Sequence, residues 1–218
     1  MSGVDLFKIQ ARNIQSLYPT LNYHEDSDVN PFIEGRLVLR DSANNYIDAY
    51  SIRITPSEFY PLRFPFVFEL EGRLPFNIDW HVFEDGRCCI KSLPEEILIC
   101  KTELNISQFI EEQVVPYFFN QKHRELFGYY LKERSHGSQG HIEFFEDVFK
   151  TNNLNRIAKA LFHISRNYKP SRVDKCFCGS SLKYRKCCRE PHQTISIFSK
   201  DEIEIFLRMV INSPRFSI

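Results

Sequence analysis

The 218-residue sequence predicts an α+β fold, in which an antiparallel β-meander is flanked by helices. Two observations predict this class. Apolar residues recur with a strand-like period of two before residue 70, and with a helix-like period after residue 105. A cysteine-rich segment follows near the C-terminus. We therefore expect a main domain at 1–168, and a small metal-binding segment with a terminal helix at 169–218.

The N-terminal half is predicted to form one helix and three strands. A helix is expected at 4–17, where apolar residues recur at roughly helical spacing. Alternating apolar and polar residues at 33–39 and 46–54 flank a turn-rich loop, which predicts an antiparallel hairpin. A third strand fits 66–70. The stretch 73–99 has little periodicity, and we interpret it as a functional loop.

The second half is predicted to be helical. A helix begins near residue 105, and Pro116 should kink it or end its first part. The segment 141–168 suits one or two core-facing helices with an interruption near 151–153. A capping box formed by Ser199 and Glu202 predicts a last helix that continues to about residue 211.

The composition argues for a soluble protein of the cytoplasm. Lysine plus arginine number 28, as do aspartate plus glutamate, so no overall charge favours nucleic acid or a membrane surface. The sequence has neither a charged-then-apolar leader nor an apolar run near 18 residues. In the cytoplasm thiols stay reduced, so clustered cysteines are metal ligands more often than disulfides.

Four of the seven cysteines fall within 13 residues of one another, at Cys176, Cys178, Cys187 and Cys188. Four thiolates at this spacing can close around one tetrahedral Zn²⁺, and a closed four-thiolate site is structural. Tight disulfides are the alternative. The basic run at 183–186 is interpreted as a solvated face that offsets the thiolate charge, in preference to a nucleic-acid patch.

A second candidate site lies in the 73–99 loop. There an Asp85-Gly86 turn delivers Cys88 and Cys89 into an apolar context, with His81 shortly before them. A rigid loop can present a nucleophile in this way. However, buried cysteines are commonly inert, so the residues alone leave open whether either thiol is catalytic.

The order of the elements resembles the ubiquitin-conjugating enzyme family over roughly residues 1–165. Tyr60, Pro61 and Pro65 match the residues that precede a strand in that family. The active cysteine of the family lies three residues after a glycine, and counting from Gly86 reaches Cys89. The resemblance implies a UBC-like meander, with Cys89 as the nucleophile and Cys88 as a packing residue.

The sequence departs from the family at one informative place. Where the family has His-Pro-Asn, this chain has His81-Val82-Phe83 and a shorter loop. The compact form resembles bacterial relatives, including those encoded in antiphage operons of the CBASS type. The segment 136–140, with its histidine His136, also resembles those relatives, although it reads equally well as a glycine-rich turn between helices.

The cysteine-rich segment resembles the SEC-C zinc knuckle over about residues 174–190. In its known settings this knuckle docks other proteins, so the resemblance implies a protein contact and not a reaction.

The first resemblance implies acyl transfer through a thioester on Cys89, to an amine such as a target lysine. His81 or Arg87 could assist the thiol or the oxyanion, and His81 could equally lock the loop. The sequence has no glycine-rich adenylate-binding loop, so a partner must supply the activated C-terminus. The CBASS resemblance implies a cGAS-like nucleotidyltransferase as that donor, in antiviral defence.

Three alternatives remain. The first is an inactive UBC-fold binding module that docks partners through its zinc knuckle. The second is a hydrolytic cysteine enzyme that uses Cys89 with His81 or His136, for which the sequence identifies no orienting Asn or Asp. A nucleic-acid-binding zinc protein is the weakest, because one basic knuckle on a neutral chain gives little phosphate affinity.

Overall fold

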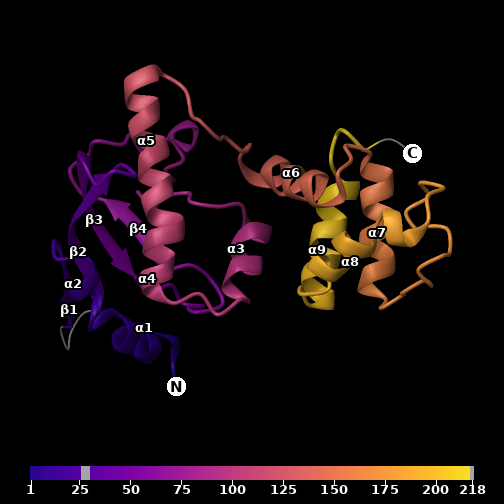
Figure 1. The fold of residues 1–218 in the computed structure, drawn as a ribbon, viewed down its shortest axis with the longest axis horizontal. Helices are drawn as coiled ribbons and strands as arrows, with labels where there is room; N and C mark the ends of the chain where they lie inside the picture. Colours follow the sequence, from indigo (N-terminus) through magenta and orange to yellow (C-terminus); the bar gives the residue numbers. More distant parts are fainter. Residues whose placement is uncertain (26–29, 217–218) are drawn as a thin grey trace. The chain divides into compact units, whose positions relative to one another are not determined.

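The computed structural model describes residues 1–25 and 30–216, and it confirms the α+β class. Contacts divide the chain into two compact units, both drawn in Figure 1. The first comprises Met1–Lys91 and Ile99–Glu133, and the second comprises Ser92–Leu98 and Arg134–Ile218. This division groups the helices between residues 134 and 168 with the cysteine-rich segment. The predicted domain boundary after residue 168 stays a prediction.

The first unit is built on a four-stranded antiparallel sheet with the order β1-β2-β3-β4 (Figure 1). The strands are β1 Leu21–His24, β2 Phe32–Arg40, β3 Tyr46–Thr55 and β4 Phe66–Glu69. The pairing of β2 with β3 confirms the predicted hairpin, and β4 confirms the strand predicted at 66–70. The sequence did not indicate β1, because four residues are too few to establish an alternation.

The helix predicted at 4–17 is divided in two. A capping box between Ser2 and Asp5 begins α1 (Gly3–Ala11), and a second short helix, α2, covers Ile14–Leu17. The break falls at Asn13, whose carbonyl oxygen accepts hydrogen bonds from the backbone and side chain of Ser16. Asparagine is a weak helix former, so this local turn interrupts the predicted helix.

One long helical segment packs on the sheet. It comprises α4 (Ile106–Phe109), a π-helical stretch (Ile110–Val114) and α5 (Val115–Phe127). Pro116 was expected to kink the helix or to end its first part, but the chain stays helical through it. The helix is irregular just before Pro116, in the π-helical stretch, because proline has no N–H to donate to the preceding turn. The ring of Phe118 lies 4.7 Å from that of Tyr50 on β3, both fully buried.

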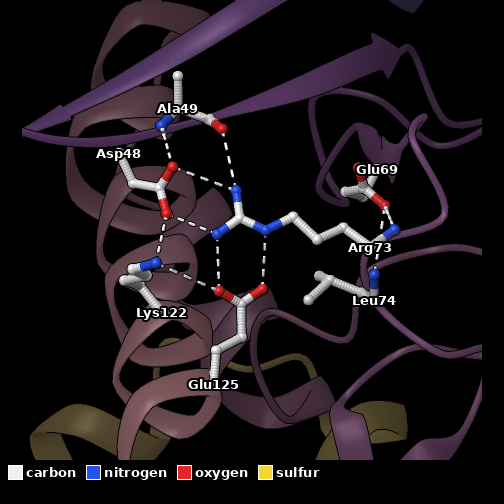
Figure 2. A network of polar contacts seen from close by, with 7 residues as sticks. All are labelled: Asp48, Ala49, Glu69, Arg73, Leu74, Lys122 and Glu125. Atoms are coloured by element: carbon white, nitrogen blue, oxygen red, sulfur yellow. Dashed lines mark hydrogen bonds and ion pairs between the residues drawn. The ribbon is translucent and has the colours of Figure 1, made fainter.

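A half-buried ionic network joins the sheet, α5 and the segment that follows β4 (Figure 2). The Arg73 guanidinium donates to both oxygens of Glu125, at 2.9 and 2.6 Å, and to both oxygens of Asp48, at 3.2 and 2.5 Å. Lys122 Nζ lies 2.7 Å from the same Asp48 carboxylate. The bonds from Arg73 hold the pKa of Asp48 well below its usual range.

A second carboxylate fixes the backbone of the same segment. Glu69 is buried, and its oxygens accept the backbone N–H groups of Glu71, Arg73 and Leu74 at 2.8 to 3.3 Å. Figure 2 shows the bonds from Arg73 and Leu74. The Arg73 guanidinium also lies 4.0 Å from the centre of the Tyr50 ring. The backbone from Glu71 to Leu74, just after β4, is therefore held by hydrogen bonds to the Glu69 carboxylate.

The second unit is helical. Its helices are α3 (Leu93–Cys100, of which the residues up to Leu98 belong here), α6 (Gly137–Phe149), α7 (Leu154–Ser165), α8 (Arg189–Ile195) and α9 (Lys200–Ile211). The break between α6 and α7 confirms the predicted interruption, and the Ser199–Glu202 capping box begins α9 as predicted. Helix α7 packs against α9, and Phe145, Leu161 and Phe206 are buried in the unit's core.

Two of these helices were not predicted. Helix α3 begins where Ser92 Oγ donates to Glu95 Oε2 at 2.6 Å, with Pro94 in the first turn. A serine followed three residues later by glutamate is a start signal for a helix, but it was overlooked because 73–99 was treated as one loop. Helix α8 has only seven residues, too few for a helical period to be visible.

None of the helices formed by residues 1–25 and 30–216 combines the length and apolar character needed to cross a membrane.

Candidate catalytic loop and cysteine cluster

The candidate catalytic loop of the first unit is a tight hairpin between His81 and Cys89. A 3₁₀ turn at Ile78–Trp80 ends at His81, whose φ of 50° and ψ of 38° place it in the left-handed region and reverse the chain. Val82 then forms an antiparallel bridge with Cys88, and the backbone N–H of Cys89 donates to the carbonyl oxygen of His81 at 2.7 Å.

The Asp-Gly turn identified in the sequence closes this hairpin. The backbone N–H of Gly86 donates to Phe83 at 2.9 Å, and Gly86 adopts a φ of 85° that other residues rarely reach. A Cβ at this position would also lie 3.0 Å from the ring of Phe76. The backbone conformation and the nearby Phe76 ring both favour glycine at position 86. This position is three residues before Cys89, the candidate nucleophile.

The hairpin brings the two predicted catalytic side chains together. A ring nitrogen of His81 and the Sγ of Cys89 lie within 4.8 Å of each other. Cys89 is half-buried, and the side chain of His81 is 15% exposed. The arrangement leaves a partly exposed thiol beside an imidazole that could accept its proton, as nucleophilic catalysis by cysteine requires.

The two adjacent thiols have different surroundings. Successive residues of an extended chain point to opposite faces, so Cys88 faces the core while Cys89 is half-buried. The backbone N–H of Cys88 donates to Val67 of β4 at 2.8 Å. Burial raises the pKa of the Cys88 thiol to about 12, so this thiol stays protonated near neutral pH. Of the two, only Cys89 has both exposure and a neighbouring base.

The structure assigns Arg87 to the turn. Its Nε donates to Asp85 at 2.6 Å, and its guanidinium lies over the rings of Phe66 and Phe83 at 4.8 and 5.4 Å. These contacts favour a structural role for Arg87 over the assistance to the thiol considered from the sequence. His136, the other candidate histidine, belongs to the second unit, where it immediately precedes α6.

Sequence reasoning missed two residues around His81. The ring of Tyr130 meets the His81 ring edge-on at 5.0 Å, and Glu133 Oε1 lies 3.9 Å from His81 Nε2. Glu133 is therefore a carboxylate beside the imidazole, the kind of group that the sequence did not identify. Both residues follow α5, about 50 positions after His81, so no local spacing pattern could have indicated them.

The four-cysteine cluster, Cys176, Cys178, Cys187 and Cys188, lies in the second unit. Its four Sγ atoms are all within 4.8 Å of one another. Cys187 Sγ lies 3.5 Å from Cys178 Sγ and 3.8 Å from Cys188 Sγ, far beyond the length of a disulfide bond. The segment therefore brings all four predicted ligands to one point.

Short-range geometry produces this convergence. The backbone N–H of Gly179 donates to Cys176 at 3.2 Å with a φ of 83°, which reverses the chain after the first pair of cysteines. Lys175 and Lys183 form an antiparallel bridge that returns the chain toward the second pair. The chain reversal therefore begins directly after Cys178.

The cluster fits a tetrahedral metal ion. Four sulfurs about 2.3 Å from one ion would be separated by about 3.8 Å. The sulfur of Cys187 lies at 3.5 and 3.8 Å from those of Cys178 and Cys188, close to that value. Two hydrogen-bond donors lie beside the sulfur of Cys187 and would stabilise its negative charge as a thiolate. Ser180 Oγ lies 3.2 Å from Cys187 Sγ, and an Arg156 nitrogen lies 3.7 Å from the same atom. The four cysteines could therefore hold a metal ion.

Comparisons with protein-family models, with curated proteins and with solved structures found no match to this chain.

Proposed function

We propose that this chain is a ubiquitin-conjugating-like acyl carrier that accepts an activated protein C-terminus as a thioester on Cys89 and transfers it to an amine. The observation that carries the proposal is the pairing of His81 with a half-buried Cys89 at the base of one hairpin, within 4.8 Å. The burial of Cys88 supports the choice between the two thiols.

The reaction consists of two acyl transfers. The Cys89 thiolate attacks the activated carbonyl carbon of the donor, the activating group leaves with its bonding electrons, and a thioester forms. A lysine amine of the target then attacks the thioester, and the amide forms as the Cys89 thiolate departs. At an ordinary thiol pKa of about 8.5 only a few per cent is thiolate near pH 7, so His81 serves as the base that accepts the thiol proton.

The arrangement of the first unit supports the UBC-like assignment. A helix precedes a four-stranded antiparallel meander, and Tyr60, Pro61 and Pro65 lie between β3 and β4 where the family resemblance requires them. The candidate cysteine follows β4 on an irregular segment, and long helices come after it. This order is the one on which the sequence resemblance was based.

For the four-cysteine cluster, we propose Zn²⁺ in a structural SEC-C-like knuckle. The fit of four sulfurs to one tetrahedral ion supports a closed site, which leaves no position for a reacting water. Zinc suits four thiolates better than magnesium or calcium, which prefer oxygen ligands. The knuckle would stabilise the second unit and dock a partner protein.

The donor and setting follow from the family resemblance. We propose a cGAS-like nucleotidyltransferase as the protein whose activated C-terminus loads Cys89, a lysine of a target protein as acceptor, and antiphage defence of the CBASS type in the bacterial cytoplasm as the setting.

The experiment that tests the acyl carrier is co-expression of the wild type, Cys89→Ala and Cys88→Ala with the neighbouring genes, followed by non-reducing gels and intact mass spectrometry. A thiol-labile species of higher mass is expected in the wild type and in Cys88→Ala, and its mass would identify the donor. Loss of that species in Cys89→Ala alone would support the proposal. An adduct that survives in Cys89→Ala would refute the assignment of the nucleophile.

A second candidate function is a catalytically inactive UBC-fold adaptor that binds partners through its knuckle. One observation favours it: Val82 and Phe83 stand where the family has Pro and Asn, so the asparagine side chain associated with the oxyanion or loop is missing. Absence of any adduct, together with recovery of a neighbour bound to the wild type but not to Cys176→Ser, would favour this adaptor over the acyl carrier.

A further inference from the structure

Three consecutive backbone carbonyl groups at the base of the catalytic hairpin are held by three side chains of one helix. Arg124 Nη1 donates to the carbonyl oxygen of Asp79. Gln121 Nε2 donates to that of Trp80 at 2.8 Å, and the Tyr117 hydroxyl donates to that of His81 at 2.9 Å.

We infer that Tyr117, Gln121 and Arg124 act as positioning residues for the Cys89 reaction, by fixing the backbone of residues 79–81. We name this set of three hydrogen bonds the carbonyl ladder. The inference rests on the proposed function for its consequence, but the ladder itself is defined by geometry.

The spacing of the three donors matches the geometry of a helix. Positions 117, 121 and 124 are four and three residues apart, so their side chains line one face of α5. Each donor serves one carbonyl of a segment that runs past that face. A chance set of contacts would not assign one donor to each of three successive carbonyl groups in order.

Two of these bonds are made by side chains with little access to water. Gln121 is 1% exposed and Tyr117 is 9% exposed, so neither side chain can readily exchange its bond to a carbonyl for one to water. Burial also raises the pKa of Tyr117 well above its ordinary value, which keeps its hydroxyl protonated and able to donate.

The middle of the carbonyl ladder is reinforced by a second contact. Tyr130 donates its hydroxyl proton to Gln121 Oε1 at 3.1 Å, which leaves the Gln121 amide nitrogen facing Trp80. The Arg124 guanidinium also lies 4.3 Å from the Trp80 ring and 4.6 Å from the Tyr130 ring. The orientations of Gln121 and Arg124 are therefore fixed by neighbours and not by their own rotamer preferences alone.

The carbonyl ladder is connected to His81 and Cys89 by the carbonyl oxygen of His81. The His81 carbonyl oxygen accepts both the Tyr117 hydroxyl and the Cys89 backbone N–H, so Tyr117 and Cys89 share an acceptor. His81 is held in the left-handed region, which is uncommon for a residue with a side chain and needs support from its surroundings. Loosening the ladder should therefore disturb the His81 ring and the Cys89 thiol together.

The test uses the full chain with Tyr117→Phe and Gln121→Met, each of which removes ladder bonds with little change in size. Tyr60→Phe is the matched control, because Tyr60 is also buried and its hydroxyl donates to Gln10 of α1. Amide hydrogen exchange of Cys89, measured by NMR, reports the opening of its bond to His81.

We expect the Cys89 amide to exchange about fivefold faster in Tyr117→Phe and Gln121→Met than in the wild type, and within about twofold of the wild type in Tyr60→Phe. Equal exchange rates in all three variants would overturn the carbonyl ladder. This measurement needs no donor, so its result is independent of whether Cys89 carries an acyl group.

The link to catalysis is tested by the pH profile of Cys89 alkylation with iodoacetamide, read by mass spectrometry. A profile displaced in the ladder variants but not in Tyr60→Phe would support positioning, and coincident profiles would overturn it. A wild-type Cys89 that reacts like a free thiol at every pH would count instead against the proposed acyl carrier, while hydrogen exchange still decides the ladder.

Discussion

Replacement of Arg73 by methionine should destabilise the first unit by about 3 kcal/mol at pH 7. The substitution keeps an unbranched side chain but removes five hydrogen bonds, to Asp48, Glu125 and the carbonyl oxygen of Ala49 (Figure 2). The two carboxylates are 17 and 19% exposed, so they would be left largely without solvent. Breaking a buried pair costs about 3–5 kcal/mol. Lys122 still compensates part of the charge, which favours the lower end.

The loss should depend on pH in a defined direction. Arg73 lowers the pKa of Asp48 in the folded state, so the stabilisation is present above the unfolded-state pKa of about 3.9 and is lost as the pH falls through the folded-state pKa. Methionine at position 73 relaxes this depression. The difference in the free energy of unfolding between wild type and variant should therefore be largest near neutral pH and shrink below about pH 4.

Urea unfolding followed by tryptophan fluorescence measures this difference. Trp80 is the only tryptophan of the sequence, and it lies in the first unit, so its emission reports the unit that contains Arg73. Arg53→Met is the matched control: Arg53 also pairs with one carboxylate, Glu34 at 2.6 Å, but its side chain is 45% exposed. The control should lose no more than about 1 kcal/mol. An Arg73→Met loss equal to that of the control, or unchanged between pH 7 and pH 3, would refute the reasoning.

Three further outcomes are expected in the second unit. Metal analysis should find about one ion per chain, and the double variant Cys176→Ser with Cys187→Ser should lose it; a chain that retains the ion would contradict the four-thiolate site. Ser199→Ala should weaken the start of α9 by about 1 kcal/mol, seen as faster amide exchange in its first turn; unchanged exchange would speak against the cap. Burial lowers the pKa of His141, so thermal stability measured by circular dichroism should fall as the pH drops below about 6.5, the ordinary histidine value. His141→Phe should flatten that fall, and an unaltered pH dependence would exclude His141 as its source.

Much of the fold could be predicted because its signals are local. The hairpin of β2 and β3, the break before α7 and the cap at Ser199 each depend on residues only a few positions apart. The four-cysteine cluster was predicted for the same reason, since a turn at Gly179 and a bridge between Lys175 and Lys183 bring the ligands together within 13 residues. The short elements β1 and α8 were missed because they contain too few residues to show a period.

The surroundings of the candidate catalytic loop could not be predicted in the same way. The sequence indicated His81 and Cys89, which are eight residues apart. It did not indicate Gln121 or Tyr130, because each acts on a backbone group or side chain across the tertiary structure. From the sequence alone, a glutamine on a helix is expected at the surface. Only the fold shows that Gln121 is buried and that its amide donates to a backbone carbonyl.

The grouping of α6 and α7 with the cysteine-rich segment bears on how this chain can be divided or recombined. Cutting after residue 168 would remove α9, which packs against α7, and would expose apolar side chains of the core that these two helices share. Such a truncated protein should be prone to aggregation, even though its sheet is intact. By the same reasoning, the cysteine-rich segment cannot be moved to another protein alone, because its cysteines share one core with α6, α7 and α9.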